Sequence, residues 1–127
     1  MGGRGFNPAL LPADIPRGNL GDCFDHCFAI AVRNKKYKYV EGMATNPITH
    51  DWILHAWITD GINAYDPTWR ALDSAGKDVL LPVDYHGVII DIIDVAQFIQ
   101  TTEHKSVLAN FHLSPTLAKK ALRIEVV

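Results

Sequence analysis

The sequence has little excess charge, few cysteines and no long apolar run. Its formal net charge is −2, from 12 basic and 14 acidic residues, so it lacks the strongly basic character of proteins that bind nucleic acids or anionic membranes. No apolar run approaches the roughly 20 residues of a membrane span, and no apolar segment near the start resembles a secretory signal. We therefore expect a cytoplasmic protein with no nucleic-acid or membrane partner.

The two cysteines do not suggest a disulfide framework. Cys23 and Cys27 are four residues apart, and on one helix their Cβ atoms would point in parallel directions, which suits a disulfide poorly. The closely spaced ligand pairs of structural zinc sites are absent, although Cys23, His26, His55 and Asp66 remain an alternative set of metal ligands. No glycine-rich phosphate loop or dinucleotide fingerprint is present. We expect reduced thiols, no metal and no cofactor.

Periodicity and turn signals predict one α+β domain over residues 23–127, preceded by an irregular N-terminal arm over residues 1–22. The arm holds five of the nine glycines and three prolines. The predicted helices cover residues 23–34, 91–102 and 114–122, and the predicted strands cover residues 36–44, 49–59 and 62–67.

Smaller features complete this prediction. Asp22 is expected to cap the first helix, and Gly42 is expected to form a bulge in the first strand. Residues 71–78 are expected to form a loop, and residues 85–87 an edge strand, because proline and glycine interrupt the apolar run around them. The predicted architecture is a helix carrying Cys23 on a small antiparallel sheet, followed by a helical tail.

The second and third strands predict a β-hairpin with Asp60-Gly61 as its two-residue turn. Thr59 then pairs with Ile62, which places His55 directly opposite Asp66 on the same face, with their Cβ atoms about 5 Å apart. A carboxylate beside an imidazole holds it in one tautomer. The pair therefore predicts a base and its orienting acid.

Each member of this pair also has a plain structural explanation. His55 can be a histidine at the edge of the core, with His50 as a second candidate for the base. Asp66 precedes Pro67, and aspartate in that position commonly begins a turn.

Cys23 is the candidate nucleophile, although a buried structural cysteine is the alternative. It falls in the first turn of the predicted helix, where free N–H groups and the helix dipole favour an anion. His26 and Trp57 are candidates to line the pocket. Asn19 is a candidate oxyanion donor, with capping of the loop as its alternative role.

Five segments in combination resemble a known family. They are Cys23-Phe24, Tyr39-Val40-Glu41-Gly42, His55-Ala56-Trp57, Asp66-Pro67-Thr68-Trp69 and Tyr85-His86-Gly87. The combination resembles an uncharacterised family of small bacteriophage and bacterial proteins that look like minimal papain-like and transglutaminase-like cysteine proteins.

The resemblance runs from about Cys23 to Leu122, and residues 91–122 are similar to the helical tail of that family. It implies Cys23 as nucleophile, His55 as base and Asp66 as orienting acid. The sequence departs from the family pattern after the nucleophile, where His26 and Cys27 replace the expected asparagine and alanine.

The expected function is cysteine-dependent acyl transfer, either hydrolysis of an amide or peptide bond or a transglutaminase-like reaction, on a protein or peptide substrate. The alternative is a non-catalytic binding module, of phage or bacterial origin, that modulates a host protein. The residues predict the class of chemistry and not the substrate.

Overall fold

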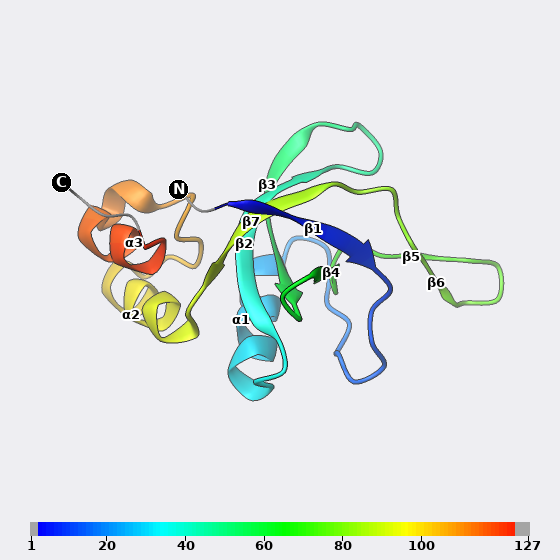
Figure 1. Ribbon diagram of the computed structural model, residues 1–127, viewed down its shortest axis with the longest axis horizontal. Helices are drawn as coiled ribbons and strands as arrows, with labels where there is room; N and C mark the ends of the chain where they lie inside the picture. Colours follow the sequence, from blue (N-terminus) through cyan, green and yellow to red (C-terminus); the bar gives the residue numbers. More distant parts are fainter. Residues whose placement is uncertain (1–2, 124–127) are drawn as a thin grey trace.

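The protein, described here by a computed structural model over residues 3–123, is built on a closed barrel with the strand order β1-β4-β3-β2-β7 (Figure 1). These strands are β1 (Arg4–Ala9), β2 (Lys38–Thr45), β3 (Trp52–Thr59), β4 (Asn63–Tyr65) and β7 (Tyr85–Ile90). The helices are α1 (Cys23–Arg33), α2 (Ile92–Thr102) and α3 (Pro115–Ala121), and a short 3-10 helix spans Phe111–Leu113. The mixture of helices and strands confirms an α+β fold.

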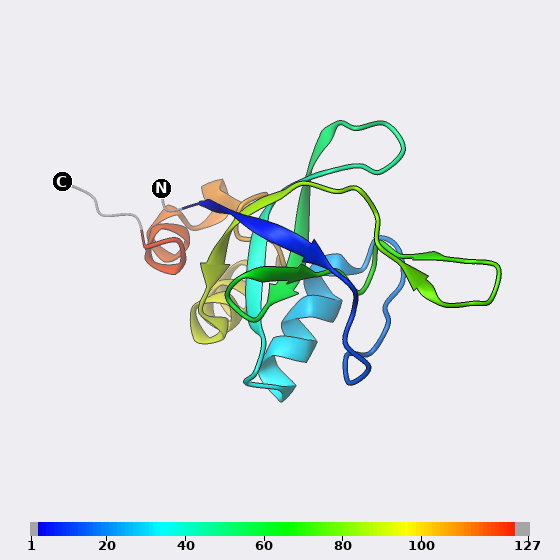
Figure 2. The same ribbon diagram turned by 45° about the vertical axis from the view of Figure 1, so that its right-hand side comes forward.

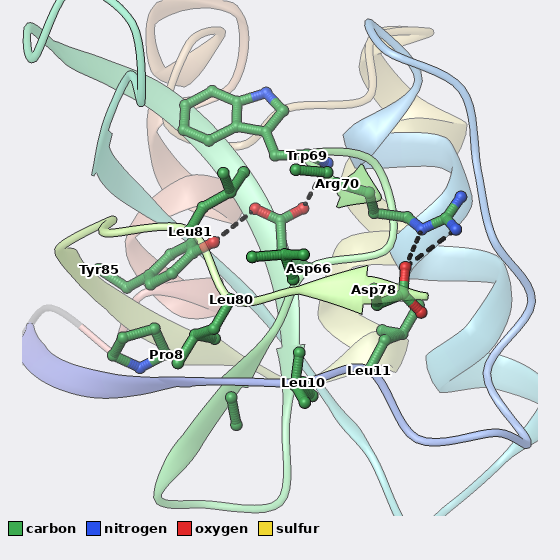
Figure 3. Close-up of a pocket in the computed structure, with 13 residues that line it drawn as sticks. Pro8, Leu10, Leu11, Asp66, Trp69, Arg70, Asp78, Leu80, Leu81 and Tyr85 are labelled. Carbon is green, nitrogen blue, oxygen red and sulfur yellow. Dashed lines mark hydrogen bonds and ion pairs between the residues drawn. The ribbon is translucent and has the colours of Figure 1, made fainter. Parts of the chain in front are cut away.

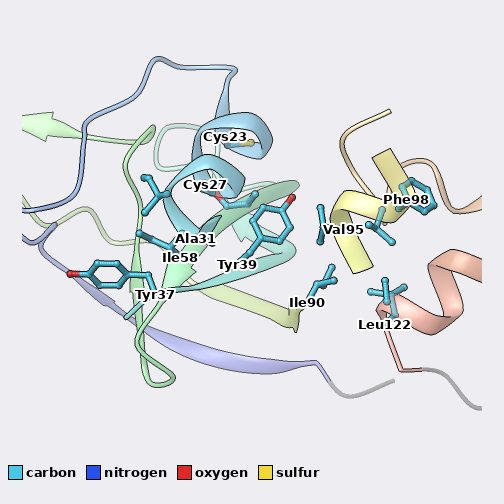
Figure 4. Close-up of a cluster of buried hydrophobic side chains, with 14 of the residues drawn as sticks. Cys23, Cys27, Ala31, Tyr37, Tyr39, Ile58, Ile90, Val95, Phe98 and Leu122 are labelled. Carbon is cyan, nitrogen blue, oxygen red and sulfur yellow. The ribbon is translucent and has the colours of Figure 1, made fainter. Parts of the chain in front are cut away.

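The barrel has an apolar interior and a second core on its outer surface. Side chains from all five strands meet inside, among them Phe6, Trp57 and Tyr85. The opposite faces of β2, β3 and β7 pack against α1, α2 and α3 in a larger cluster (Figure 4). Strand side chains alternate between two faces, so each of these strands contributes to both cores.

Helix α1 lies over the outer face of β3 and β2 (Figure 2). Its apolar residues recur with helical spacing, which buries Cys23, Cys27, Ile30 and Ala31 on one side. The predicted first helix is therefore confirmed. Asp22 occupies the N-cap position, but its side chain makes no capping hydrogen bond, which leaves N–H groups of the first turn without that partner.

The C-terminal helices are held on the barrel by a buried carboxylate. Glu41 is fully buried and accepts hydrogen bonds from Tyr39, Ser106, Val107 and Leu108 at 2.8–3.1 Å. Burial raises the pKa of Glu41, and these hydrogen bonds oppose that effect. The helices predicted over residues 91–102 and 114–122 are present, and Asp91 caps the first of them.

Three of the predicted elements are wrong in detail. The arm over residues 1–22 is not irregular throughout, because β1 pairs with both β4 and β7 and closes the barrel. The strand expected at an edge is instead β7, which lies between β1 and β2. The expected loop over residues 71–78 contains the small β5–β6 hairpin, formed by Ala71–Leu72 and Asp78–Val79.

Gly42 does not form the predicted bulge. Its strand keeps continuous register on both sides, with Gly42 opposite His55 and opposite Gly87. A Cβ atom on Gly42 would lie 2.3 Å from the carbonyl oxygen of His86. The glycine is therefore explained by the close approach of β2 to β7 and not by an extra residue.

The turn between β3 and β4 is longer than predicted. Thr59 pairs with Ala64, not with Ile62, because the side chain of Asp60 binds the backbone N–H groups of Ile62 and Asn63 and builds a wider turn. The register is thus shifted by two residues. A shift of two keeps every side chain on its predicted face.

Within residues 3–123, no helix is long and apolar enough to cross a membrane. Residues 124–127 of the predicted domain, and residues 1–2 of the predicted arm, lie outside the described part of the chain.

Candidate active site

His55 and Asp66 meet where β4 leaves β3. The two strands pair only through Ile58 and Thr59, so the edge of β3 is open beside His55. Asp66 follows the last residue of β4, and its Oδ2 accepts a 2.8 Å hydrogen bond from Nε2 of His55. The structure therefore brings together the two residues that the hairpin pattern paired, although the register differs by two.

The two oxygens of the Asp66 carboxylate have different hydrogen-bond partners. Oδ2 accepts hydrogen bonds from His55 and from the hydroxyl of Tyr85, both at 2.8 Å. Oδ1 accepts hydrogen bonds from the backbone N–H groups of Thr68 and Trp69, at 3.2 and 3.1 Å. Asp66 is thus a turn-forming residue through one oxygen and an acid that orients His55 through the other.

The side chain of Cys23 lies close enough to the imidazole of His55 to raise its pKa. Because Nε2 of His55 faces Asp66, Nδ1 is the ring nitrogen that remains for the thiol. Cys23 is the first residue of α1 and is 7% exposed, whereas His55 is 2% exposed. Asp66 is 8% exposed, so all three side chains are buried.

The pKa of His55 is higher than that of an ordinary histidine. Burial is the largest single influence and lowers the pKa of His55, but the hydrogen bond to Asp66, the negative charge of that carboxylate and the nearby Cys23 side chain outweigh burial and raise the pKa to about 9. His55 is therefore protonated at neutral pH. The structure thus places a charged imidazolium beside both the Asp66 carboxylate and the Cys23 side chain.

The other cysteine has a different environment. Cys27 lies one turn further along α1, is fully buried, and directs its thiol toward the carbonyl oxygen of Ala56 at 3.7 Å (Figure 4). Burial raises the pKa of this thiol well above its ordinary value. Cys27 is a packed thiol without a base.

The predicted pocket residues have different positions. His26 donates a 2.6 Å hydrogen bond to the carbonyl of Pro16 and its ring packs on Gly18, so this ring faces the N-terminal segment. Asn19 is exposed in the turn before α1, where its carbonyl accepts the N–H of Asp22. Trp57 shares the barrel-facing side of β3 with His55, and their ring centroids are 6.3 Å apart.

Two residues of the site were not predicted. The indole of Trp69 stacks on the His55 ring, with centroids 3.9 Å apart and planes 19° apart. The hydroxyl of Tyr85 binds Asp66 from the opposite side of the barrel. For Trp69, its place three residues after Asp66 is a local signal that could have indicated a position near His55, whereas no local signal connects Tyr85 with Asp66.

A small pocket lies beside Asp66, and Trp69 and Tyr85 also line it (Figure 3). Its volume is about 30 Å³, enough for one or two water molecules. Leu10, Leu11 and Leu81 line it, and the ion pair between Arg70 and Asp78 lies at its rim. This pocket is too small for a peptide, and its lining includes neither Cys23 nor His55.

Metal binding finds no support in this geometry. Within the described residues, no cluster of three histidine, cysteine or acidic side chains is arranged to hold a metal ion. Of the alternative ligand set, His26 is engaged with Pro16, and His55 and Asp66 are engaged with each other.

No protein-family model, curated protein or solved structure matches the chain.

Proposed function

We propose that this protein is a cysteine-dependent acyl-transfer enzyme with Cys23 as nucleophile, His55 as the proton-transfer residue and Asp66 as its orienting acid. The observation that supports the proposal best is a group of three buried side chains, in which the His55 imidazole donates a hydrogen bond to the Asp66 carboxylate and lies beside the Cys23 thiol. Burying such a pair costs free energy, so a purely structural role is a weaker explanation.

In the proposed reaction, the Cys23 thiolate attacks the carbonyl carbon of an amide or ester. A C–S bond forms and the carbonyl π electrons move to oxygen, where N–H groups in the first turn of α1 are placed to stabilise the charge. His55 gives its proton to the leaving amine or alcohol as the acyl–nitrogen or acyl–oxygen bond breaks. Water or an amine, losing its proton to His55, then attacks the thioester and releases Cys23.

The architecture is consistent with the papain-like and transglutaminase-like resemblance. A helix begins at the cysteine and packs on the outer face of a barrel whose third strand carries the histidine. A protein or peptide amide is the proposed substrate.

A non-catalytic binding module remains the second candidate. The observation that favours it is burial, because Cys23 is only 7% exposed and a substrate carbonyl needs access to the sulfur. In that case the three residues hold α1 on the barrel, and the protein acts by binding a host protein.

Alkylation by iodoacetamide distinguishes these candidates. The rate at each cysteine is measured from pH 5 to pH 9, with fragmentation spectra assigning the label to Cys23 or Cys27. We expect rapid labelling of Cys23 at a pH well below 8.5, the reference pKa of a thiol, and slower labelling in His55→Ala. Cys27 is the internal control, because it is on the same helix and fully buried.

Slow labelling of Cys23 with the pH profile of an ordinary thiol would rule out the enzyme and leave the binding module. If labelling is rapid, a peptide-substrate screen follows. Cys23→Ala should abolish turnover of any substrate found, and retained turnover would show that the nucleophile is wrong.

A further inference from the structure

The outer face of the β2–β3 hairpin is apolar and uncovered. Met43 pairs with Leu54, and Trp52 lies two residues before Leu54, so the three side chains share one side of the ladder. We call them the hairpin face. Trp52 is 52% exposed and Met43 39% exposed, whereas Trp57 of the same strand is fully buried.

Along β3, the residue of the hairpin face nearest to Cys23 is Leu54. The Cys27 thiol contacts the backbone of Ala56, and Cys23 lies one helical turn, about 6 Å, further toward the start of α1. Leu54 lies two residues, about 7 Å, before Ala56 along β3 on the same face. The start of α1 points toward the hairpin in two views (Figures 1 and 2).

The same face continues into a pocket on the far side of Met43. This pocket has a volume of about 180 Å³, and Met43, Val88, Leu108 and His86 contribute to its walls. Met43 pairs with His86 across β2 and β7, so the pocket adjoins the hairpin face directly. Its one carboxylate, Glu41, already accepts four hydrogen bonds.

We infer that the hairpin face is the substrate-binding surface of the Cys23 site, and that it selects substrates with a large apolar group next to the reacting carbonyl. This inference rests on the proposed function. The face is continuous with the Cys23 site, so an extended chain with its carbonyl at Cys23 has the Leu54 and Trp52 side chains beside it, followed by the apolar pocket at Met43.

The test compares three alkylating reagents at Cys23: iodoacetamide, N-hexyliodoacetamide and N-(carboxymethyl)iodoacetamide. Each rate is divided by the rate of the same reagent with glutathione, which removes intrinsic reactivity. We expect the hexyl reagent to be favoured about tenfold over iodoacetamide, as burial of part of its chain predicts, and the carboxymethyl reagent to show no advantage.

Trp52→Ala should reduce the hexyl preference to within about twofold. Trp52 is half-exposed at the start of β3, so the variant should fold. Met43→Ala gives a second variant on the same face. Ile93→Ala is the matched control, because Ile93 is an exposed apolar residue on α2 and should not change the preference.

The outcomes separate this inference from the proposed function. A rapid iodoacetamide reaction with no hexyl preference, or with a preference that survives both Trp52→Ala and Met43→Ala, would overturn the binding surface and leave the chemistry standing. A slow iodoacetamide reaction with a Trp52-dependent hexyl preference would overturn the chemistry and leave the hairpin face as a binding surface. A slow iodoacetamide reaction without a hexyl preference would overturn both the proposed function and the binding surface.

Discussion

At the scale of single residues, the state of His55 depends on the charge of Asp66. The Asp66 carboxylate accepts hydrogen bonds from His55 and Tyr85 through one oxygen, and from the N–H groups of Thr68 and Trp69 through the other. In Asp66→Asn one of these oxygens becomes an NH2 group, which cannot accept a hydrogen bond. We expect the pKa of His55 to fall below 7, measured by NMR titration of the imidazole, and alkylation of Cys23 at pH 6 to slow by about tenfold or more.

The control for this substitution is Tyr85→Phe, which removes one donor to Asp66 and keeps the carboxylate. It should leave His55 protonated at neutral pH. A His55 pKa that stays near 9 in Asp66→Asn would contradict the role given to the carboxylate.

The raised pKa of His55 also predicts how stability varies with pH. The folded protein binds this proton more tightly than the unfolded chain, where the pKa is near 6.5. Protonation therefore stabilises the fold: the contribution is fully present below about pH 6.5 and is lost as the pH rises through about 9. Urea unfolding should show a decrease of up to about 3 kcal/mol over this range, and His55→Gln should flatten it. Parallel profiles for the two proteins would disprove the linkage.

At the scale of elements, the contact between β2 and β7 requires glycine. A Cβ atom on Gly42 would lie 2.3 Å from a carbonyl oxygen and 2.4 Å from the Cα of Gly87. Both neighbours are backbone atoms, so neither can move away by rotating a side chain. Gly42→Ala should lower the free energy of unfolding by about 2–3 kcal/mol. Gly5→Ala is the control, since its Cβ would lie 3.9 Å from its nearest neighbour, and should change stability by less than about 1 kcal/mol. Equal effects of the two would contradict the close packing.

Glu41 is the connection between the barrel and the C-terminal helices. Glu41→Gln would place an NH2 group against two of the four donors, so we expect a loss of about 2–4 kcal/mol in unfolding free energy and faster hydrogen exchange in residues 103–122. Ser106→Ala removes only one of the donors and should cost about 1 kcal/mol. Unchanged exchange in Glu41→Gln would show that other contacts hold these helices.

The sequence predicts the elements that depend on local signals. The helices follow from apolar periodicity and from caps such as Asp91, and the strand carrying His55 follows from alternation and its turn. β1 was not predicted because its partners are distant: Asn7 pairs with Asn63 and Arg4 with Gly87. In the site, the His55–Asp66 pair is a local pattern, whereas the contact between Tyr85 and Asp66 joins residues 19 positions apart that only barrel closure brings together.

At the scale of the whole molecule, the helices and the barrel share one apolar cluster, with α1, α2 and α3 all contributing to it. Strands β2, β3 and β7 contribute both to this cluster and to the barrel interior, and small single domains usually unfold as one unit. We therefore expect urea transitions followed by tryptophan fluorescence and by far-UV circular dichroism to coincide. Separate midpoints would show that the C-terminal helices unfold independently of the barrel.

The turn after Thr59 limits how the chain can change in length. Adding or removing two residues between Thr59 and Ala64 keeps Asp66 on the side of His55, whereas a change of one residue turns it to the other face. Homologous proteins that keep the His55–Asp66 pair should therefore have turns whose lengths differ from this one by even numbers of residues. A single glycine inserted after Gly61 should abolish the His55–Asp66 hydrogen bond, while an inserted pair of glycines should preserve it.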